Sequence, residues 1–463
     1  MTTTLPLDLT DLRSRFAGEV LGPDSPGYDD ARRLWNGAID RRPAVIARVT
    51  SNSDAVEALR FARLHRLPIA VRGGGHSIPG LSTCDDGMLI DLGGMKSIAV
   101  DPVARTAVVG AGVVWGELDA ATQEFGLAVT GGEVSDTGVA GLTLGGGVGW
   151  LKRTCGLSCD NLLAADLVTA DGRAVRASAE ENPELFWGLR GGGGNFGIVT
   201  RFTFRLHEIG PILYGGALVY PAARAHEVLR VLRDQAATAP DEVSLMAALV
   251  VAPPAPEFGE VQLQPVVVLA AMYHGSLEDG ERALSPLRSL LPDPAADLLG
   301  PIPYVAIQQM VDAATPRGLH YYVKSEWLSD LRDEVVDGLI EHHLSRTSPI
   351  GPILLHHMGG VASRVPADAT AFRFRDAEWS LTVIGAWEPG QDPAPHTAWA
   401  RSAWNAARVA SSGGGYVNHL DGDEGADRVR EAYGAVTYDR LAALKKIWDP
   451  DNVFRLNQNV RPT

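Results

Sequence analysis

The stretch Val71–Gly80, VRGGGHSIPG, places an arginine before three consecutive glycines and a histidine directly after them. Glycine has no Cβ atom, so three in a row let the backbone approach another group closely. Backbone N–H groups that are exposed in this way bind phosphate oxygens well. A histidine in such a loop is accessible for acid, base, ligand or nucleophile roles. These residues alone predict a phosphate cradle, a functional histidine or a flexible turn.

The sequence on the N-terminal side of this stretch reads as a strand–helix–strand unit. Residues 44–49 are a short apolar run, residues 51–67 place apolar side chains at helical spacing, and residues 68–75 lead into the glycines. Ser53 and Asp54 are the expected helix caps. The quoted stretch is therefore predicted to be the loop that follows the second strand.

Two further glycine clusters follow in the first half of the chain. Eight of the 21 residues in Thr130–Trp150 are glycine, and Gly191–Gly194 is a run of four. The first of these has little helical periodicity and is predicted to be a long functional loop. Neither a G-x-x-x-x-G-K-[ST] motif nor a G-x-G-x-x-G motif opening a helix is present. Three clusters together indicate a long ligand with several contact points, such as a dinucleotide.

Hairpins are expected around Pro102–Arg105 and at Asp171-Gly172, where turn residues separate strand-like runs. Beyond Leu206 the glycine clusters stop. Residues 215–390 mix apolar strand candidates with amphipathic helix candidates, a pattern typical of an α+β domain on an antiparallel sheet. The chain closes with a helix that ends at Asp449-Pro450 and a polar tail.

Composition sets the broad class. A chain of 463 residues predicts two domains, and 45% hydrophobic with 21% charged residues is normal for a globular protein. The net charge of −15, without a basic run, disfavours nucleic acid and anionic membranes as partners. Three cysteines at these spacings predict neither a disulfide framework nor a metal site. With no secretory signal and no apolar run of membrane length, a cytoplasmic location is expected.

Four ordered motifs carry a resemblance to a known family: VRGGGHSIPG, LGGGVGWLKRTCGLSCDNLL, NPELFWGLRGGGGNFGIVTRF and DPDNVFRLNQNV. Together they resemble the berberine-bridge-enzyme-like FAD-linked oxidases of the vanillyl-alcohol-oxidase superfamily, in particular the bacterial branch. The resemblance extends from about Asp29 to the C-terminus. It implies an α+β fold with a PCMH-type FAD-binding domain of two subdomains, and a substrate domain whose antiparallel sheet is covered by helices. The implied division is 1–206 (PCMH-type core about 40–208) for FAD, 207–410 for substrate, and 411–463 as a C-terminal segment returning to the FAD domain.

The resemblance also implies the cofactor site, residue by residue. His76 would form one covalent bond to FAD. The further residues that would hold this cofactor are Arg72, Gly73, Gly74, Gly75, Ser77, Val134, Thr137, Gly138, Gly141, Gly145, Gly147, Asp160, Asn161, Gly197, Ile198, Val199, Asn457 and Asn459.

Two departures from the family pattern matter. Many relatives carry a second flavin link through a cysteine, and Val134 stands at that place here. A single link through His76 is therefore expected, with Cys155 as a minority alternative.

Plant relatives use an acidic base after a Gly-Gly pair, whereas Arg364 stands near that position. The candidates that remain for a catalytic role are Tyr416, His357 and Tyr322. Since His356 and His357 are neighbours on a strand, they point to opposite faces and only one of them can face the flavin.

The implied activity is that of a flavin-dependent oxidase. It would transfer a hydride from a small organic or secondary-metabolite substrate to FAD, and O₂ would reoxidise the flavin with release of H₂O₂. The alternatives are a dehydrogenase of the same fold with low oxygen reactivity, and a non-catalytic FAD-binding protein. The implied partners are a small-molecule substrate and O₂, with no metal, nucleic acid or membrane.

Overall fold

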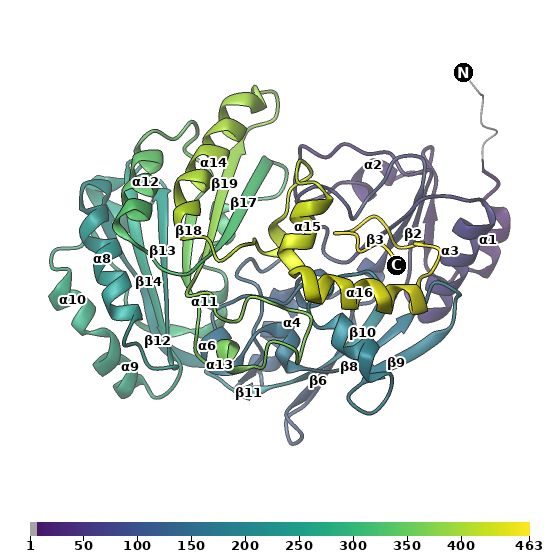
Figure 1. Cartoon of the computed structure of the whole chain (residues 1–463), viewed down its shortest axis with the longest axis horizontal. Helices are drawn as coiled ribbons and strands as arrows, with labels where there is room; N and C mark the ends of the chain where they lie inside the picture. The colour runs from purple at the N-terminus through teal and green to yellow at the C-terminus, as the bar shows by residue number, and fades with distance from the viewer. Residues whose placement is uncertain (1–6) are drawn as a thin grey trace.

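The computed structural model describes residues 7–463, so the first six residues of the predicted FAD domain lie outside it. Figure 1 shows two units side by side: the N-terminal half of the chain builds one, and the middle of the chain builds the other. The C-terminal helices α15 (Ala426–Tyr433) and α16 (Ala435–Trp448) lie against the first unit.

The first unit begins with a four-stranded sheet of order β1-β2-β4-β3. Its strands are β1 (Glu19–Leu21), β2 (Val45–Arg48), β3 (Ile69–Arg72) and β4 (Met88–Asp91). β2 and β3 both pair in parallel with β4, and α3 (Asn52–Leu64) connects them, as expected for a strand–helix–strand unit. The predicted caps were wrong by a few residues. Ser51 caps α3, because its side chain accepts a hydrogen bond from the backbone N–H of Asp54.

A five-stranded antiparallel sheet of order β5-β6-β10-β8-β9 completes this unit. Its strands are β5 (Ile98–Asp101), β6 (Thr106–Gly110), β8 (Leu162–Val168), β9 (Ala174–Ser178) and β10 (Ile198–Arg205). Both predicted hairpins are confirmed by the β5–β6 and β8–β9 pairs. The glycine-rich segment 130–150 is not wholly loop, because a short helix, α5 (Val139–Leu144), forms where four apolar or small side chains are buried together.

The second unit is one eight-stranded antiparallel sheet, ordered β15-β12-β14-β13-β18-β19-β17 with β16 paired to β12. Its strands are β12 (Ile212–Pro221), β13 (Val243–Val251), β14 (Pro265–Tyr273), β15 (Ala296–Asp297), β16 (Gly300–Pro303), β17 (His320–Leu328), β18 (Ile353–His357) and β19 (Trp379–Trp387). The helices α8 (Ala225–Ala236), α12 (Asp333–Leu344) and α14 (Pro393–Ala407) cover one face of it. This arrangement confirms the predicted α+β fold with a helix-covered antiparallel sheet.

Shorter elements connect these layers. They are α1 (Thr10–Arg15), α2 (Tyr28–Ala31), α4 (Trp115–Gln123), β7 (Leu127–Ala128), α6 (Lys152–Cys155), α7 (Pro183–Leu189), β11 (His207–Glu208), α9 (Leu277–Leu284), α10 (Pro286–Leu290), α11 (Tyr304–Gln308) and α13 (Val361–Arg364), with short 3₁₀ turns between them. Among the described residues no helix has both the length and the apolar character needed to cross a membrane.

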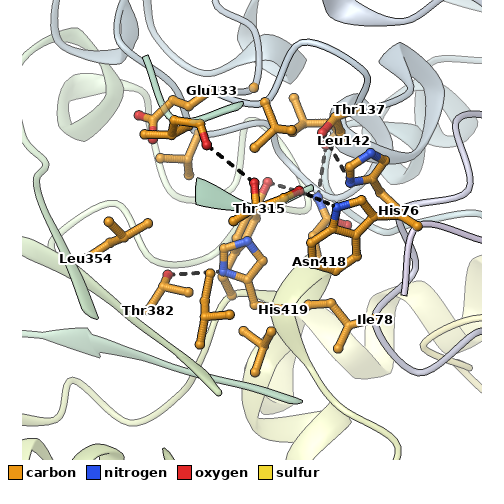
Figure 2. A pocket seen from close by; sticks show the side chains of 18 of the residues that line it. His76, Ile78, Glu133, Thr137, Leu142, Thr315, Leu354, Thr382, Asn418 and His419 are labelled. Atoms are coloured by element: carbon orange, nitrogen blue, oxygen red, sulfur yellow. Dashed lines mark hydrogen bonds between the residues drawn. The ribbon is translucent and has the colours of Figure 1, made fainter. Parts of the chain in front are cut away.

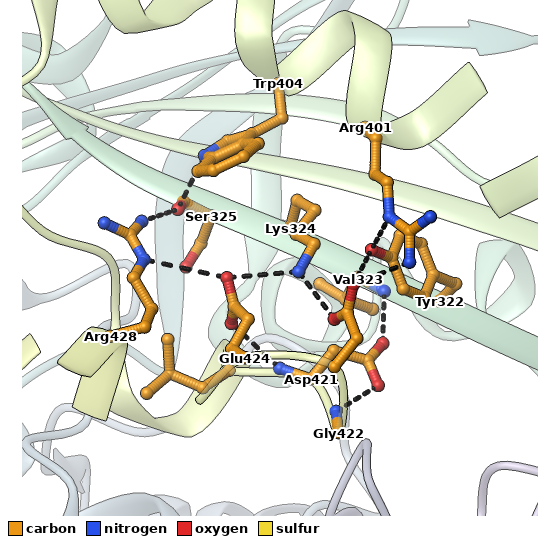
Figure 3. A network of polar contacts seen from close by, with 12 residues as sticks. Tyr322, Val323, Lys324, Ser325, Arg401, Trp404, Asp421, Gly422, Glu424 and Arg428 are labelled. Atoms are coloured by element: carbon orange, nitrogen blue, oxygen red, sulfur yellow. Dashed lines mark hydrogen bonds and ion pairs between the residues drawn. The ribbon is translucent and has the colours of Figure 1, made fainter. Parts of the chain in front are cut away.

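The chain changes sheet between β10 and β12, and its last segment packs back on the first unit. Leu441 and Leu444 of α16, and Phe454 and Val460 after it, belong to the same buried cluster as the strands of the first unit. A polar network fixes the start of this segment to β17 (Figure 3). There, buried Lys324 lies 2.7 Å from Asp423 and 3.1 Å from Glu424. The exact division at residues 206 and 410 stays a prediction.

Candidate active site

A deep cavity of about 910 Å³ lies between the two units. The glycine loops of the first unit form one wall, and the uncovered face of the eight-stranded sheet forms the opposite wall. Residues of the C-terminal segment, including Tyr416, His419 and Asn457, close a third side. Figure 2 shows His76 and Glu133 on the loop side and Thr382 and Leu354 on the sheet side.

The two glycine loops meet at Gly74 and Gly138. A Cβ atom on Gly74 would collide with the backbone N and Cα of Gly138, and one on Gly138 would collide with Gly74. Glycine is required at both places because the two backbones are in direct contact, which brings both loops to the cavity wall. Gly75 adds a turn with φ of +78°, a conformation that favours glycine.

His76 projects from the first loop and is held on one ring nitrogen. Its Nε2 lies 2.6 Å from Oδ1 of Asp136, and its ring stacks on Trp35 at a centroid distance of 5.1 Å. Burial lowers the pKa of His76 below its ordinary value, although Asp136 opposes this. Burial alone would raise the pKa of Asp136, but His76 and Arg317 lower it to about 2. The geometry therefore fits a neutral imidazole that donates its Nε2–H to a carboxylate and leaves Nδ1 with a lone pair.

A second polar cluster joins residues from the glycine loops, the sheet and the C-terminal segment on the cavity wall. Nε2 of His356 lies 2.7 Å from Oε2 of Glu133, and Nδ1 of His419 lies 3.2 Å from Oγ1 of Thr382. Burial alone would raise the pKa of Glu133, but His356 and Lys152 hold it below its ordinary value. Burial lowers the pKa of His419 to about 4, with His356 adding to the effect. The cluster thus holds a carboxylate, a histidine paired with it and a neutral histidine.

Most of the predicted cofactor residues lie on the cavity wall. They are Gly73, Gly74, Gly75, His76, Ser77, Val134, Thr137, Gly138, Gly141, Gly197, Val199 and Asn457, and Tyr416 lies with them. The hydroxyl oxygen of Tyr416 accepts hydrogen bonds from the N–H of Gly147 and the amide of Asn418, both at 2.9 Å. Burial raises the pKa of Tyr416 to about 12, so at neutral pH its O–H is a donor and not a base.

Other predicted cofactor residues lie behind the wall: Arg72, Gly145, Gly147, Asp160, Asn161, Ile198 and Asn459. Arg72 points away from the cavity and pairs with buried Asp91 at 2.8 Å. Asp160 pairs with buried Arg375 at 2.7 Å, which fixes the loop 156–161 to the second unit. Cβ atoms on Gly145 and Gly147 would collide with Asn418 and Ser158, so these glycines serve packing between loops. In this structure these residues lie behind the cavity wall and support the residues that form it.

Two of the predicted catalytic residues are outside the cavity. The pleat of β18 turns His356 into the cavity and His357 to the opposite face, where its Nε2 lies 3.2 Å from the guanidinium of Arg153. Tyr322 likewise points away, and its hydroxyl lies 2.7 Å from both Asp423 and the Nε of Arg401 (Figure 3). The structure therefore corrects these two assignments and leaves Tyr416 as the one predicted catalytic residue on the wall.

Sequence reasoning missed Glu133, Trp35 and His419, and considered His356 only as the neighbour of His357. Glu133 stands among glycines, and His419 follows Tyr416 by three residues in YVNH. Both residues could therefore have been identified from the sequence, because an ionisable side chain in a loop of small residues is accessible to a ligand. No local pattern marks Trp35, which reaches His76 only through the fold.

Cys155 lies in a buried apolar cluster and is absent from the cavity wall. Burial raises the pKa of its thiol to about 12. A thiol of this kind is not a nucleophile at neutral pH.

Two segments of the chain match models of known protein families. Residues 43–178 match a family model described as "FAD binding domain", and residues 415–461 match one described as "Berberine and berberine like". The chain is an FAD-dependent oxidoreductase. It belongs to the berberine-like family of FAD-linked oxidases, as two relatives and a solved structure show.

The chain is 33% identical over 458 residues to (R)-6-hydroxynicotine oxidase of Paenarthrobacter nicotinovorans, an alignment that covers 96% of this chain and 97% of the relative. It is 32% identical over 448 residues to an FAD-linked oxidoreductase of Dictyostelium discoideum, covering 96% and 95%. The crystal structure of 6-hydroxy-D-nicotine oxidase from Arthrobacter nicotinovorans superposes with a TM-score of 0.84 at 31% identity, covering 97% of this chain and 98% of that one. These likenesses confirm the family and fold that the four motifs predict.

Proposed function

We propose that this protein is an oxidase that holds FAD through one covalent bond to His76. It oxidises a small organic molecule and uses O₂ as the electron acceptor. The observation that carries the proposal is the placement of His76, at the contact of two glycine loops, with Nε2 bonded to Asp136 and the ring on the cavity wall. An imidazole fixed in this way presents Nδ1 as the nucleophile that alkylation of the flavin requires.

The remaining wall suits a flavin dinucleotide. Gly73, Gly74 and Gly75 line the cavity with backbone where a pyrophosphate would need N–H donors, and Gly193 and Gly194 add a second loop to this wall. Asn457 donates to the carbonyl of Gly194 at 3.0 Å, and within residues 7–463 its buried Oδ1 has no partner. Such an unpaired acceptor is costly unless a ligand satisfies it. Bound FAD would supply the hydride acceptor and pass the electrons to O₂.

The second polar cluster, which holds Glu133, His356 and His419, supplies a proton acceptor. We assign this role to His419, because it is neutral at physiological pH and lies on the cavity wall. The His356–Glu133 pair lies beside it and sets its electrostatic surroundings. As the carbon of a substrate alcohol or amine loses hydride, His419 takes the proton from oxygen or nitrogen. The overall balance is R₂CH–OH + O₂ → R₂C=O + H₂O₂, or the corresponding imine from an amine.

The covalent link is tested by acid precipitation of the purified protein. Flavin that stays with the pellet is expected for the native chain, and the variant His76→Ala should release all of it. The matched control is His226→Ala, since His226 forms a comparable pair with Asp337 at the exposed surface, 2.9 Å apart. Flavin retained by His76→Ala would point to another attachment residue, and a colourless native pellet would refute the covalent link.

The rate at which O₂ reoxidises the reduced flavin distinguishes an oxidase from a dehydrogenase. After reduction in the absence of air, mixing with O₂ should restore oxidised flavin within seconds and release one H₂O₂ per flavin. Reduced flavin that persists for minutes in air would favour the dehydrogenase alternative. A chain purified without any flavin, and unable to bind added FAD, would overturn both.

A further inference from the structure

The sheet wall of the cavity divides into an apolar part and a polar part. Because side chains alternate along a strand, every second residue of each strand faces the cavity. The residues of β12, β14 and β13 that line the cavity are only alanine, valine and methionine, among them Ala217, Val219, Val268, Ala270, Ala248 and Val250. Polar groups appear only on the next two strands, as His356 of β18 and Ser380 and Thr382 of β19. The polar part coincides with the His419–Glu133 cluster.

The small side chains of the apolar part leave space in the cavity for a ligand. Ala217 pairs directly with Ala270 across strands, and Ala248 pairs with Val268, so small side chains stand side by side there and do not fill the cavity. The opposite face of the same strands is filled by larger residues such as Leu245 and Leu269. An apolar ligand gains about 25 cal/mol per Å² buried on such a wall. A sugar would leave hydroxyl groups without partners there, at about 1–3 kcal/mol each.

The apolar wall ends at an arginine. Arg346 lines the cavity near Val250, and its guanidinium donates to the carbonyl of Leu249 at 3.1 Å and contacts His343 at 2.9 Å. Its other terminal nitrogen has only the carbonyl of Gly351, at 3.5 Å. Among the described residues no carboxylate pairs with it. Burial lowers the pKa of Arg346 to about 10, so it stays positive at neutral pH. A partly buried cation of this kind is stabilised by an anion.

The strand register sets the distance between the two ends. Met246 pairs with His356, and Val250 lies four residues further along β13. At about 3.3 Å per residue the wall between them is about 13 Å long.

We propose that the substrate is an elongated, mainly apolar molecule with an anionic group at one end. Its oxidisable carbon lies beside His356 and His419, its body runs along β13 and packs against β14, and its anion contacts Arg346. This assignment rests on the proposed function for the identity of the reacting end. The two recognition features, the apolar wall and Arg346, are independent of the proposed function.

The test uses the purified holoprotein and three probes: decanoate, a linear carboxylate of matching length, decanol, and the disaccharide cellobiose. Calorimetric titration measures affinity whether or not flavin is present, and the flavin absorption spectrum reports arrival at the cofactor. Decanoate is expected to bind at least about tenfold more tightly than decanol, as a charge-assisted hydrogen bond predicts. Cellobiose is expected to show no binding. Equal affinity for decanoate and decanol would overturn the role of Arg346, and binding of cellobiose in preference to decanoate would overturn the substrate class.

Variants separate the two features. Arg346→Gln should weaken decanoate about tenfold and leave decanol unchanged, while Arg346→Lys should retain part of the preference. The control is Arg230→Gln, since Arg230 is exposed on α8. Ala248→Phe should block both probes by filling the apolar wall. Loss of decanol binding in Arg346→Gln would show that Arg346 only supports the fold and would contradict the proposal. Flavin content, measured on each preparation, distinguishes these outcomes from failure of the proposed function.

Discussion

At the residue scale, the proposed flavin link depends on which ring nitrogen of His76 is left free. Asp136 holds Nε2, Trp35 holds the plane of the ring, and Thr137 is 3.5 Å from Nδ1. Asp136 is in turn paired with Arg317 of the second unit. We therefore expect the carboxylate to be a positioning residue for formation of the flavin bond.

Asp136→Asn should slow covalent attachment without abolishing FAD binding. A hydrogen bond to a charged group contributes about 1.5–3 kcal/mol, which corresponds to about a tenfold to hundredfold loss of rate. The measurement is the growth of acid-insoluble flavin after FAD is added to cofactor-free protein. Asp337→Asn, in the surface pair with His226, is the matched control. Unchanged kinetics of attachment in Asp136→Asn would contradict the positioning role.

His419→Gln tests the proton acceptor, once a substrate is known from H₂O₂ release. Removal of a general base lowers the rate of flavin reduction by about 10²–10⁴. Because the pKa of His419 is lowered to about 4, the native rate should stay level from about pH 8 down to pH 5 and fall only near pH 4, where His419 becomes protonated. His357→Gln, on the opposite face of β18, should retain the native rate. An acid limb near pH 6.5 would assign the base elsewhere.

At the scale of elements, the cavity exists because two loops touch and one sheet face is uncovered. The loop contact requires glycine on both sides, as the collision of a Cβ atom at Gly74 with Gly138 shows. The sheet face is uncovered because α8, α12 and α14 all pack on the other side. The positions of the loops are therefore as decisive for the site as their sequences.

Gly74→Ala should destabilise the protein and loosen the cofactor. Forcing an extra carbon into a packed contact costs about 1–3 kcal/mol. The thermal unfolding midpoint should fall, and the bound FAD fraction with it. Gly300→Ala is the matched control, because a Cβ atom there meets nothing within 4 Å. Equal midpoints for the two variants would show that the loops separate without cost.

At the scale of the whole molecule, the two units meet through buried polar contacts around the cavity. Asp119 of α4 accepts a hydrogen bond from Gln308 of α11 at 3.1 Å, and Ser135 bonds Asp312 beside the His76 loop. Trp35 donates to the carbonyl of Thr315 at 2.9 Å. These contacts fix the second unit against the loops that hold His76.

The buried carboxyl of Asp119 should make the stability of this interface depend on pH. Burial raises its pKa from 3.8 to about 7, so the folded state keeps a proton that the unfolded state releases above pH 4. Unfolding is then favoured progressively as pH rises from about 4 to about 7, by up to about 4 kcal/mol. Asp119→Asn removes this dependence. The unfolding midpoint of Asp119→Asn should be close to that of the native chain at pH 4.5 and clearly higher at pH 8. A difference that stays constant with pH would show that Asp119 is ionised in the folded state.

Much of this protein could be predicted from its sequence. The strand–helix–strand unit, both hairpins, the antiparallel second sheet and the family follow from periodicity, turn residues and four ordered motifs, because these are properties of neighbouring residues. His76 and the glycines around it were identifiable for the same reason. Position 134 is a valine, which is why the sequence predicts one flavin link and not two.

Only the tertiary structure decided which polar residues face the cavity. Arg72 and Asp160 stand in motifs yet pair with Asp91 and Arg375 behind the wall, whereas Glu133, His356 and His419 come together from three distant segments. A motif fixes where the backbone runs, but the direction of a side chain depends on the pleat and on the partner it meets. For His356 and His357, adjacent in the chain, the alternation of β18 alone places one in the cavity and the other against Arg153.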